Sequence, residues 1–119
     1  MKTGRKISGG KYHDSRKSRL YERKTQENLV TLGETKRKSV RSRGGEYTNI
    51  LLRTNIANVQ SGTSIKQAEI KNVIETPQNK FLARQNRLIK GAVIETTLGK
   101  ARITNRPARE GMINAVLVK

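Results

Sequence analysis

The sequence lacks cysteine and tryptophan, and its aromatic residues are three tyrosines and one phenylalanine. Without cysteine the chain has no disulfide, no thiolate chemistry and no sulfur ligand for structural zinc. Acidic residues are also scarce, because 9 Asp and Glu stand against 26 Lys and Arg. Only 33% of the residues are hydrophobic. We therefore expect a small, mostly aliphatic core.

Long apolar runs are absent as well. The basic start of the chain is followed by no apolar segment of the kind that a secretory signal contains, and its glycines disfavour a mitochondrial transit peptide. The longest apolar run, at 115–118, is far shorter than a membrane span. We therefore expect a soluble, cytoplasmic protein.

The positive charge is large and unevenly distributed. The net charge is +17, and residues 1–45 hold 14 basic and 4 acidic residues against 12 and 5 in residues 46–119. Self-repulsion on this scale opposes compaction unless counter-charge is present, which indicates a polyanionic partner. We predict a basic extension over 1–45, disordered when free or partly helical on its target at 11–24, and a folded domain over 46–119.

The second part of the chain shows the alternation of half-buried strands. In 100–104, Ala101 and Ile103 are predicted to face inward; in 47–54, Ile50 and Leu52 are predicted to share the inner face. Residues 58–63 and 105–111 contain turn signals, and 79–88 is ambiguous between helix and strand. The predicted strands are 47–54, 68–75, 92–97, 100–104 and 112–118. They predict a mainly β fold, a small antiparallel β-barrel or sandwich.

Few residues fit a catalytic role. His13 is the only histidine, and beside Asp14 it lacks the further ligands that a metal site needs. Glu69 and Glu75 are best explained as charge partners on a solvated face. We expect no enzyme activity, no cofactor and no small-molecule substrate; an RNA-processing enzyme that uses His13 is the least favoured alternative.

The apolar and aromatic residues near the basic ones indicate which kind of polyanion the chain binds. Membrane binding requires an amphipathic helix, and the basic segment has no apolar face. Sequence-specific readers of single strands need aromatic platforms, which four scattered aromatic residues do not provide. The binding mode that is left is neutralisation of the phosphates of a folded RNA. The alternative is that the chain is a chromatin-like protein that compacts DNA.

The segment Lys36–Arg43 carries five cationic side chains in eight positions and is followed by Gly44 and Gly45. Arginine supplies forked donors that match phosphate oxygens. The predicted phosphate contacts are Arg5, Lys6, Lys11, Arg16, Lys17, Arg19, Lys36, Arg37, Lys38, Arg41 and Arg43, with Arg106 and Arg109 as a second patch on a loop.

Several motifs resemble a known family. They are Arg5–Lys11, Lys17–Glu22, Val40–Gly45, Lys90–Ile94 and the stretch from Arg106 to Leu117. In this order they are similar to the archaeal and eukaryotic small-subunit ribosomal protein family S-eight-e, in its short archaeal form. The resemblance implies a β-barrel-like body and an extension on small-subunit rRNA, with neighbouring ribosomal proteins as further partners and no catalysis.

Overall fold

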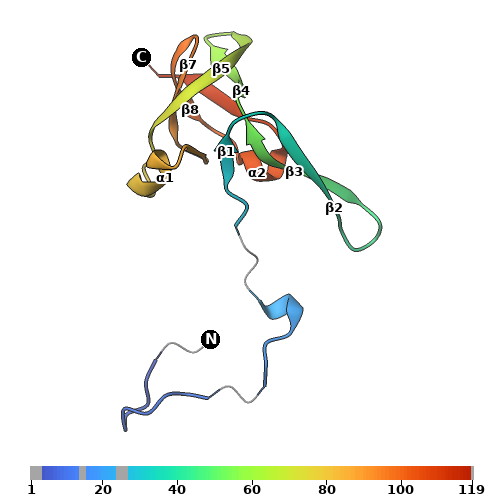
Figure 1. The fold of residues 1–119 in the computed structure, drawn as a ribbon, viewed down its shortest axis with the longest axis vertical. Helices are drawn as coiled ribbons and strands as arrows, with labels where there is room; N and C mark the ends of the chain where they lie inside the picture. The colour runs from blue at the N-terminus through green and yellow to red at the C-terminus, as the bar shows by residue number, and fades with distance from the viewer. Residues whose placement is uncertain (1–3, 14–15, 24–26, 119) are drawn as a thin grey trace.

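The computed structural model of the chain describes residues 4–13, 16–23 and 27–118. Strands dominate its body, and they form a closed barrel together with a four-stranded sheet (Figure 1). The predicted mainly β class is therefore confirmed.

The barrel consists of five strands in the order β4-β5-β7-β8-β9. Their bounds are β4 (Ile56–Ser61), β5 (Ser64–Glu75), β7 (Val93–Thr96), β8 (Gly99–Ile103) and β9 (Asn114–Leu117). Neighbours along this order pair antiparallel, whereas β4 and β9 pair parallel and close the barrel. At the closure Asn58 lies opposite Asn114, and its Nδ2 donates to the Asn114 Oδ1 at 3.3 Å.

The second sheet has the order β2-β3-β1-β6 and adjoins the barrel. Its strands are β1 (Val30–Leu32), β2 (Lys36–Arg41), β3 (Tyr47–Thr54) and β6 (Arg87–Leu88). β3 occupies a central position, with β2 antiparallel on one side and β1 parallel on the other. Because β3 ends at Thr54 and β4 begins at Ile56, the two sheets are joined directly.

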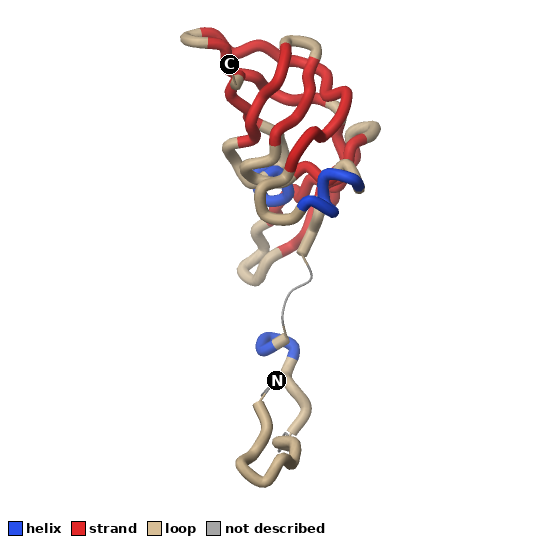
Figure 2. The backbone as a smooth tube through the Cα atoms, turned by 90° about the vertical axis from the view of Figure 1, so that its left-hand side faces the viewer, coloured by secondary structure: helices blue, strands red, loops and turns tan. Residues whose placement is uncertain are grey.

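Short helices complete the fold. They are the 3₁₀ helix η1 (Leu20–Glu22), α1 (Lys80–Arg84) and α2 (Pro107–Glu110). α1 begins after Asn79, whose side chain accepts from the Phe81 N–H at 2.9 Å, and α2 has Pro107 in its first turn. Both α-helices lie at the lower end of the barrel (Figure 2). Within the described ranges no helix is long and apolar enough to cross a membrane.

The core is aliphatic, as expected from the composition. Each barrel strand turns small or branched side chains inward. The buried apolar residues are Val30, Leu51, Ala57, Val59, Ala68, Ile70, Val73, Leu88, Ala92, Ile94, Ala101, Ile103, Ile113 and Ala115. The predicted inward orientation of Ala101 and Ile103 is confirmed, while Lys100 and Arg102 are exposed.

The other predicted segments agree in part. The prediction for 47–54 coincides with β3, and the remaining four predicted strands overlap β5, β7, β8 and β9. The ambiguous segment 79–88 contains α1 and then β6. The antiparallel expectation fails for two pairings, β1 with β3 and β4 with β9, which are parallel.

The turn predicted within 58–63, at Ser61–Thr63, is confirmed, because Gly62 and Thr63 connect β4 to β5, while residues 58–61 belong to β4. Two other local predictions were wrong. In β3 the buried apolar residue is Leu51, at 1% exposure, while Ile50 and Leu52, which were predicted to face inward, are partly exposed. Both faces of this strand carry apolar side chains, so alternation alone does not tell which face is inside. Part of the expected loop at 105–111 is the helix α2.

The division of the chain at residue 45 stays a prediction, and so does the conformation of residues 1–45 when free. β1 and β2 precede this position, and both pair with β3. The predicted helix at 11–24 includes η1, and its residues 14, 15 and 24 lie outside the described ranges.

The assignment of the core leads to a prediction about stability when a buried branched side chain is removed. Ile94→Ala should lower the free energy of unfolding by about 2–5 kcal/mol, because Ile94 is fully buried. The matched control Ile65→Ala, at a strand position that is 71% exposed, should cost less than about 1 kcal/mol. Urea unfolding followed by circular dichroism measures both, and equal losses would contradict the assigned core.

Candidate nucleic-acid interface

The hairpin of β2 and β3 projects from the body of the protein (Figure 1). Every residue of β2 is exposed, and the strand forms one edge of its sheet. Because side chains alternate along a strand, Arg37 and Arg41 share one face while Lys38 lies on the other. The hairpin therefore presents basic side chains on both faces, on a backbone held by its pairing with β3.

The tip of the hairpin is a glycine turn. The Ser42 N–H donates to the Glu46 carbonyl at 2.7 Å, and the Gly45 N–H donates to the Ser42 carbonyl at 3.3 Å. Gly44 and Gly45 have φ of 91° and 87°, a region that residues with a Cβ rarely adopt. The turn places Arg41 and Arg43 at the outer end of the hairpin, with little side-chain bulk between them.

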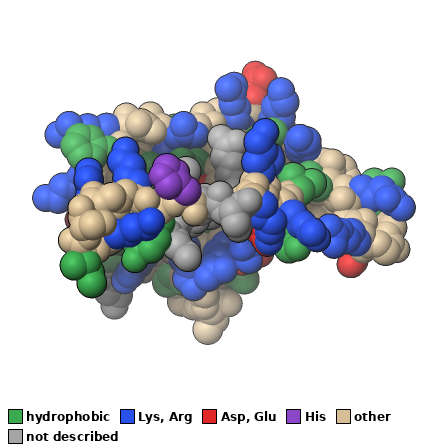
Figure 3. All heavy atoms as spheres, turned by 90° about the horizontal axis from the view of Figure 1, so that it is seen from below, with side chains coloured by type: hydrophobic (Ala, Val, Ile, Leu, Met, Phe, Trp, Pro, Cys, Tyr) green, Lys and Arg blue, Asp and Glu red, His purple; other side chains and the backbone are tan. Residues whose placement is uncertain are grey.

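The loop patch lies beside this hairpin. The Arg37 Nε donates to the carbonyl of Gly111, the residue that ends α2, at 3.3 Å. A groove of about 630 Å³ lies between the two elements, and Thr48 and Ile50 of β3 line it together with Arg106 and Arg109. The structure thus brings together two predicted patches that are more than 60 residues apart in the sequence. Figure 3 shows Lys and Arg side chains spread over the lower face of the molecule, with few acidic ones.

Glu110 is an acidic residue in the loop patch, and its carboxylate bonds within the loop. It accepts from the Arg106 N–H at 3.0 Å and from the Asn105 side chain at 2.9 Å. Both hydrogen bonds lower the pKa of Glu110, and the bond from the Arg106 N–H has the larger effect. The carboxylate orders the loop, and the Arg106 and Arg109 side chains stay exposed.

Near the N-terminus, residues 5–11 form a tight loop. The Lys6 N–H donates to the Gly10 carbonyl, and the Gly9 N–H donates to the Lys6 carbonyl, both at 2.9 Å. Arg5 and Lys11 form an antiparallel bridge, which places two cationic side chains at the open end of the loop. The Lys6 ammonium lies 5.8 Å from the centre of the Tyr12 ring.

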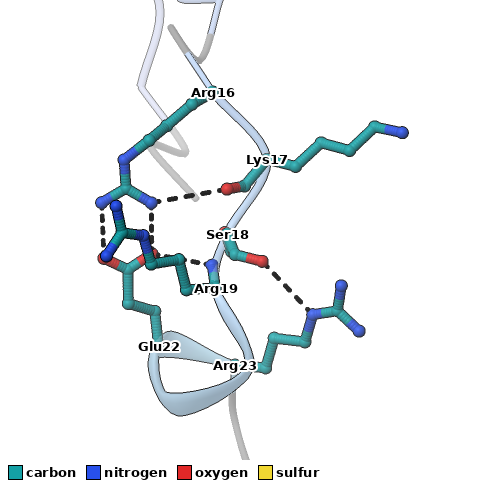
Figure 4. Close-up of polar contacts among 6 residues, drawn as sticks. All are labelled: Arg16, Lys17, Ser18, Arg19, Glu22 and Arg23. Carbon is teal, nitrogen blue, oxygen red and sulfur yellow. Dashed lines mark hydrogen bonds and ion pairs between the residues drawn. The ribbon is translucent and has the colours of Figure 1, made fainter.

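Arg16 and Glu22 form an ion pair around η1 (Figure 4). Two nitrogens of the guanidinium donate to the two carboxylate oxygens, at 2.8 and 2.6 Å, and the Arg19 N–H donates to the same carboxylate at 3.0 Å. The Arg16 guanidinium, and next the Arg19 N–H, hold the pKa of Glu22 below its usual value. Lys17 points away from this pair (Figure 4).

Comparison with known proteins gives a consistent result. Residues 1–118 match the family described as "Ribosomal protein S8e". The chain belongs to this family. It is 42% identical over 118 residues to "Small ribosomal subunit protein eS8" of Methanococcus aeolicus, covering 96% of this chain and 91% of the relative. It is 39% identical over 114 residues to the protein of the same name from Halorubrum lacusprofundi, covering 96% and 93%.

The thirteen predicted contact residues of this S8e-family chain are all exposed. Seven of them gather on the hairpin and α2, and the other six lie in the loop at 5–11 and around η1. Their role as phosphate contacts stays a prediction. Sequence analysis missed Tyr47, a 66% exposed aromatic residue opposite Arg41, because its place beside the arginines depends on strand register.

The catalytic alternative depends on His13. His13 is exposed, and its sequence neighbour Asp14 lies outside the described residues. Among the residues that are described, no group of three or more His, Asp or Glu is placed to hold a metal ion.

The ion pair around η1 predicts a specific titration. Since its pKa is lowered, Glu22 stays ionised and bonded to Arg16 above the usual glutamate pKa, and the contact is lost as the pH falls through the lowered value. An NMR titration of the Glu22 carboxyl carbon should therefore give a pKa below that of a free glutamate. Arg16→Gln should raise the Glu22 pKa towards the value of a free glutamate. Lys17→Gln, which removes the same charge from the neighbouring residue, should leave the Glu22 pKa close to its lowered value. An unchanged pKa in Arg16→Gln would contradict the pair.

Proposed function

We propose that this chain is a structural constituent of the small ribosomal subunit, located in the cytoplasm, that binds folded small-subunit rRNA through phosphate contacts and performs no catalysis. The observation that carries the proposal is the family match over residues 1–118, together with relatives named small ribosomal subunit proteins. Neighbouring ribosomal proteins are its further partners.

The hairpin supports phosphate binding over base recognition. The A-form major groove of RNA is deep and narrow, so a two-stranded ribbon contacts the backbone at its rim. Arg37, Arg41 and Arg43 offer planar guanidinium groups, which pair with phosphate oxygens through two parallel hydrogen bonds. The pairing of β2 with β3 holds the backbone that carries Arg37 and Arg41 before binding, which lowers the entropy lost on association.

The N-terminal residues extend this interface in the proposal. In this proposal residues 1–45 form a basic extension that needs the counter-charge of RNA, and the folded domain of 46–119 anchors it, partly through the pairing of β1 and β2 with β3. The compact loop at 5–11 contributes the phosphate contacts of Arg5, Lys6 and Lys11. The turn around η1 contributes those of Arg16, Lys17 and Arg19, and Glu22 orients the Arg16 side chain.

Salt dependence tests the proposal. If roughly 6–10 phosphates are neutralised, affinity for a folded rRNA fragment should fall about 10³–10⁵-fold between about 50 and 200 mM salt. Fluorescence anisotropy over a salt series measures the slope. A flat response would contradict phosphate binding, and a preference for duplex DNA in competition would favour the DNA-compacting alternative.

The hairpin arginines should account for a defined part of that slope. Arg41→Gln together with Arg43→Gln should weaken RNA binding and reduce the magnitude of the log–log salt slope by about 2, since each loses one phosphate contact. The matched control is Lys66→Gln with Lys100→Gln, two exposed lysines on barrel strands. It removes the same charge and should change the slope much less. Equal effects of the two double variants would show that only net charge matters.

A further inference from the structure

A second basic surface surrounds α1, away from the residues discussed so far. Between Glu75 and Glu95 the chain contains Lys80, Arg84, Arg87 and Lys90 and no acidic residue. Lys80 and Arg84 belong to α1 itself, while Arg87 opens β6. Arg87 donates to the Leu29 carbonyl at 3.3 Å and Lys90 acts on the pKa of Glu110, so the cations that this surface offers to a polyanion are the exposed Lys80 and Arg84.

Phe81 gives this surface an aromatic face. Its side chain is 66% exposed in a protein whose core is aliphatic, and the Arg84 guanidinium carbon lies 5.5 Å from its ring centre. α1 is held at its start by the Asn79 cap and by a hydrogen bond from the Thr76 hydroxyl to the Asn79 carbonyl. These contacts hold the backbone of α1, and the Arg84 guanidinium lies over the Phe81 ring on its exposed surface.

An open groove adjoins the Phe81–Arg84 pair. It has a volume of about 620 Å³ and lies between α1 and the end of β5. Lys80 and Arg84 line it together with Asn72 and Asn86, and Glu75 is the acidic residue of the lining. Arg84 belongs to both features, since it lines the groove and lies over the Phe81 ring. The cationic side of the groove and the aromatic ring therefore meet at Arg84.

We propose that the α1 surface binds one unpaired nucleotide of an RNA, with its base stacked on the Phe81–Arg84 pair and its phosphate held by Lys80. This inference rests on the proposed function and deepens it, because it adds a preference for an unstacked nucleotide to phosphate binding. A single aromatic face is sufficient for one base, although four scattered aromatic residues do not make a platform for several. Stacking tolerates any base, so the site selects bulges and loops by shape and not by sequence.

A protein partner is the other occupant that an exposed aromatic residue suggests. The charge argues against it, because interface cores are depleted of lysine and this surface combines Lys80 with Arg84. A nucleotide satisfies the cations and the ring together.

The test uses the full chain and two RNA hairpins that differ at one position. One hairpin carries a single bulged 2-aminopurine, and the other is fully paired. The wild-type chain should bind the bulged RNA more tightly and quench its 2-aminopurine fluorescence through stacking. Phe81→Leu, which keeps an exposed apolar side chain but removes the aromatic face, should weaken binding to the bulged RNA about 5- to 100-fold. It should leave binding to the paired RNA and the salt slope unchanged.

Controls separate this inference from the proposed function. Ile65→Ala, which removes an exposed apolar side chain from β5, should bind both RNAs as the wild type does. Equal affinity of the wild type for the two RNAs, with a steep salt slope, would overturn the nucleotide site and leave the proposed function standing. An equal loss on both RNAs in Phe81→Leu would also overturn the site. A flat salt slope on both RNAs would overturn the proposed function itself.

Discussion

The parallel pairing of β4 with β9 is the constraint on which the rest of the structure depends. It joins residues that are 56 positions apart, such as Asn58 and Asn114, and it closes a sheet that would otherwise end in two free edges. Closure is also what buries Val59 and Ala115 in a core made only of small and branched aliphatic side chains. A chain with so few apolar residues needs this geometry, because a closed barrel satisfies its backbone without aromatic bulk.

Free edges remain in the second sheet, and this is where the charge lies. β2 is an edge strand, and Lys36, Arg37, Lys38 and Arg41 line it. Charged side chains on an edge oppose pairing with another chain, so the same residues that would bind phosphate also protect the protein from association through this strand. Arg37 ties the hairpin to the rest of the molecule through the Gly111 carbonyl. Gly111 also lies close to β3, since a Cβ at this position would meet the Asn49 carbonyl oxygen at 3.4 Å, so the hairpin base and α2 behave as one unit.

Local sequence pattern was sufficient for much of the fold and for the kind of residue at the candidate interface. Alternation located β3, β5, β7, β8 and β9, and the arginine-rich stretch before Gly44 was recognisable without a structure. β4 was missed, although its buried Ala57 and Val59 alternate with the outward Asn58 and Gln60 as in other half-buried strands. Contacts between segments that are distant in the sequence leave no local pattern. Neither the burial of Val30 nor the contact of the hairpin with α2 could therefore be inferred. The site at α1 depends on the same kind of long-range arrangement.

The position of β9 in the closed barrel has a consequence for the order of folding. Because β9 supplies the strand that pairs with both β4 and β8, the barrel has no complete hydrogen-bonded ring until residues 114–117 have been synthesised. Contacts between segments far apart in sequence also form slowly. A nascent chain therefore displays its basic leading residues to surrounding polyanions well before its body becomes compact. The basic residues are thus exposed before the barrel can close, and capture by the anionic scaffold proposed above would limit aggregation of the unfinished strands.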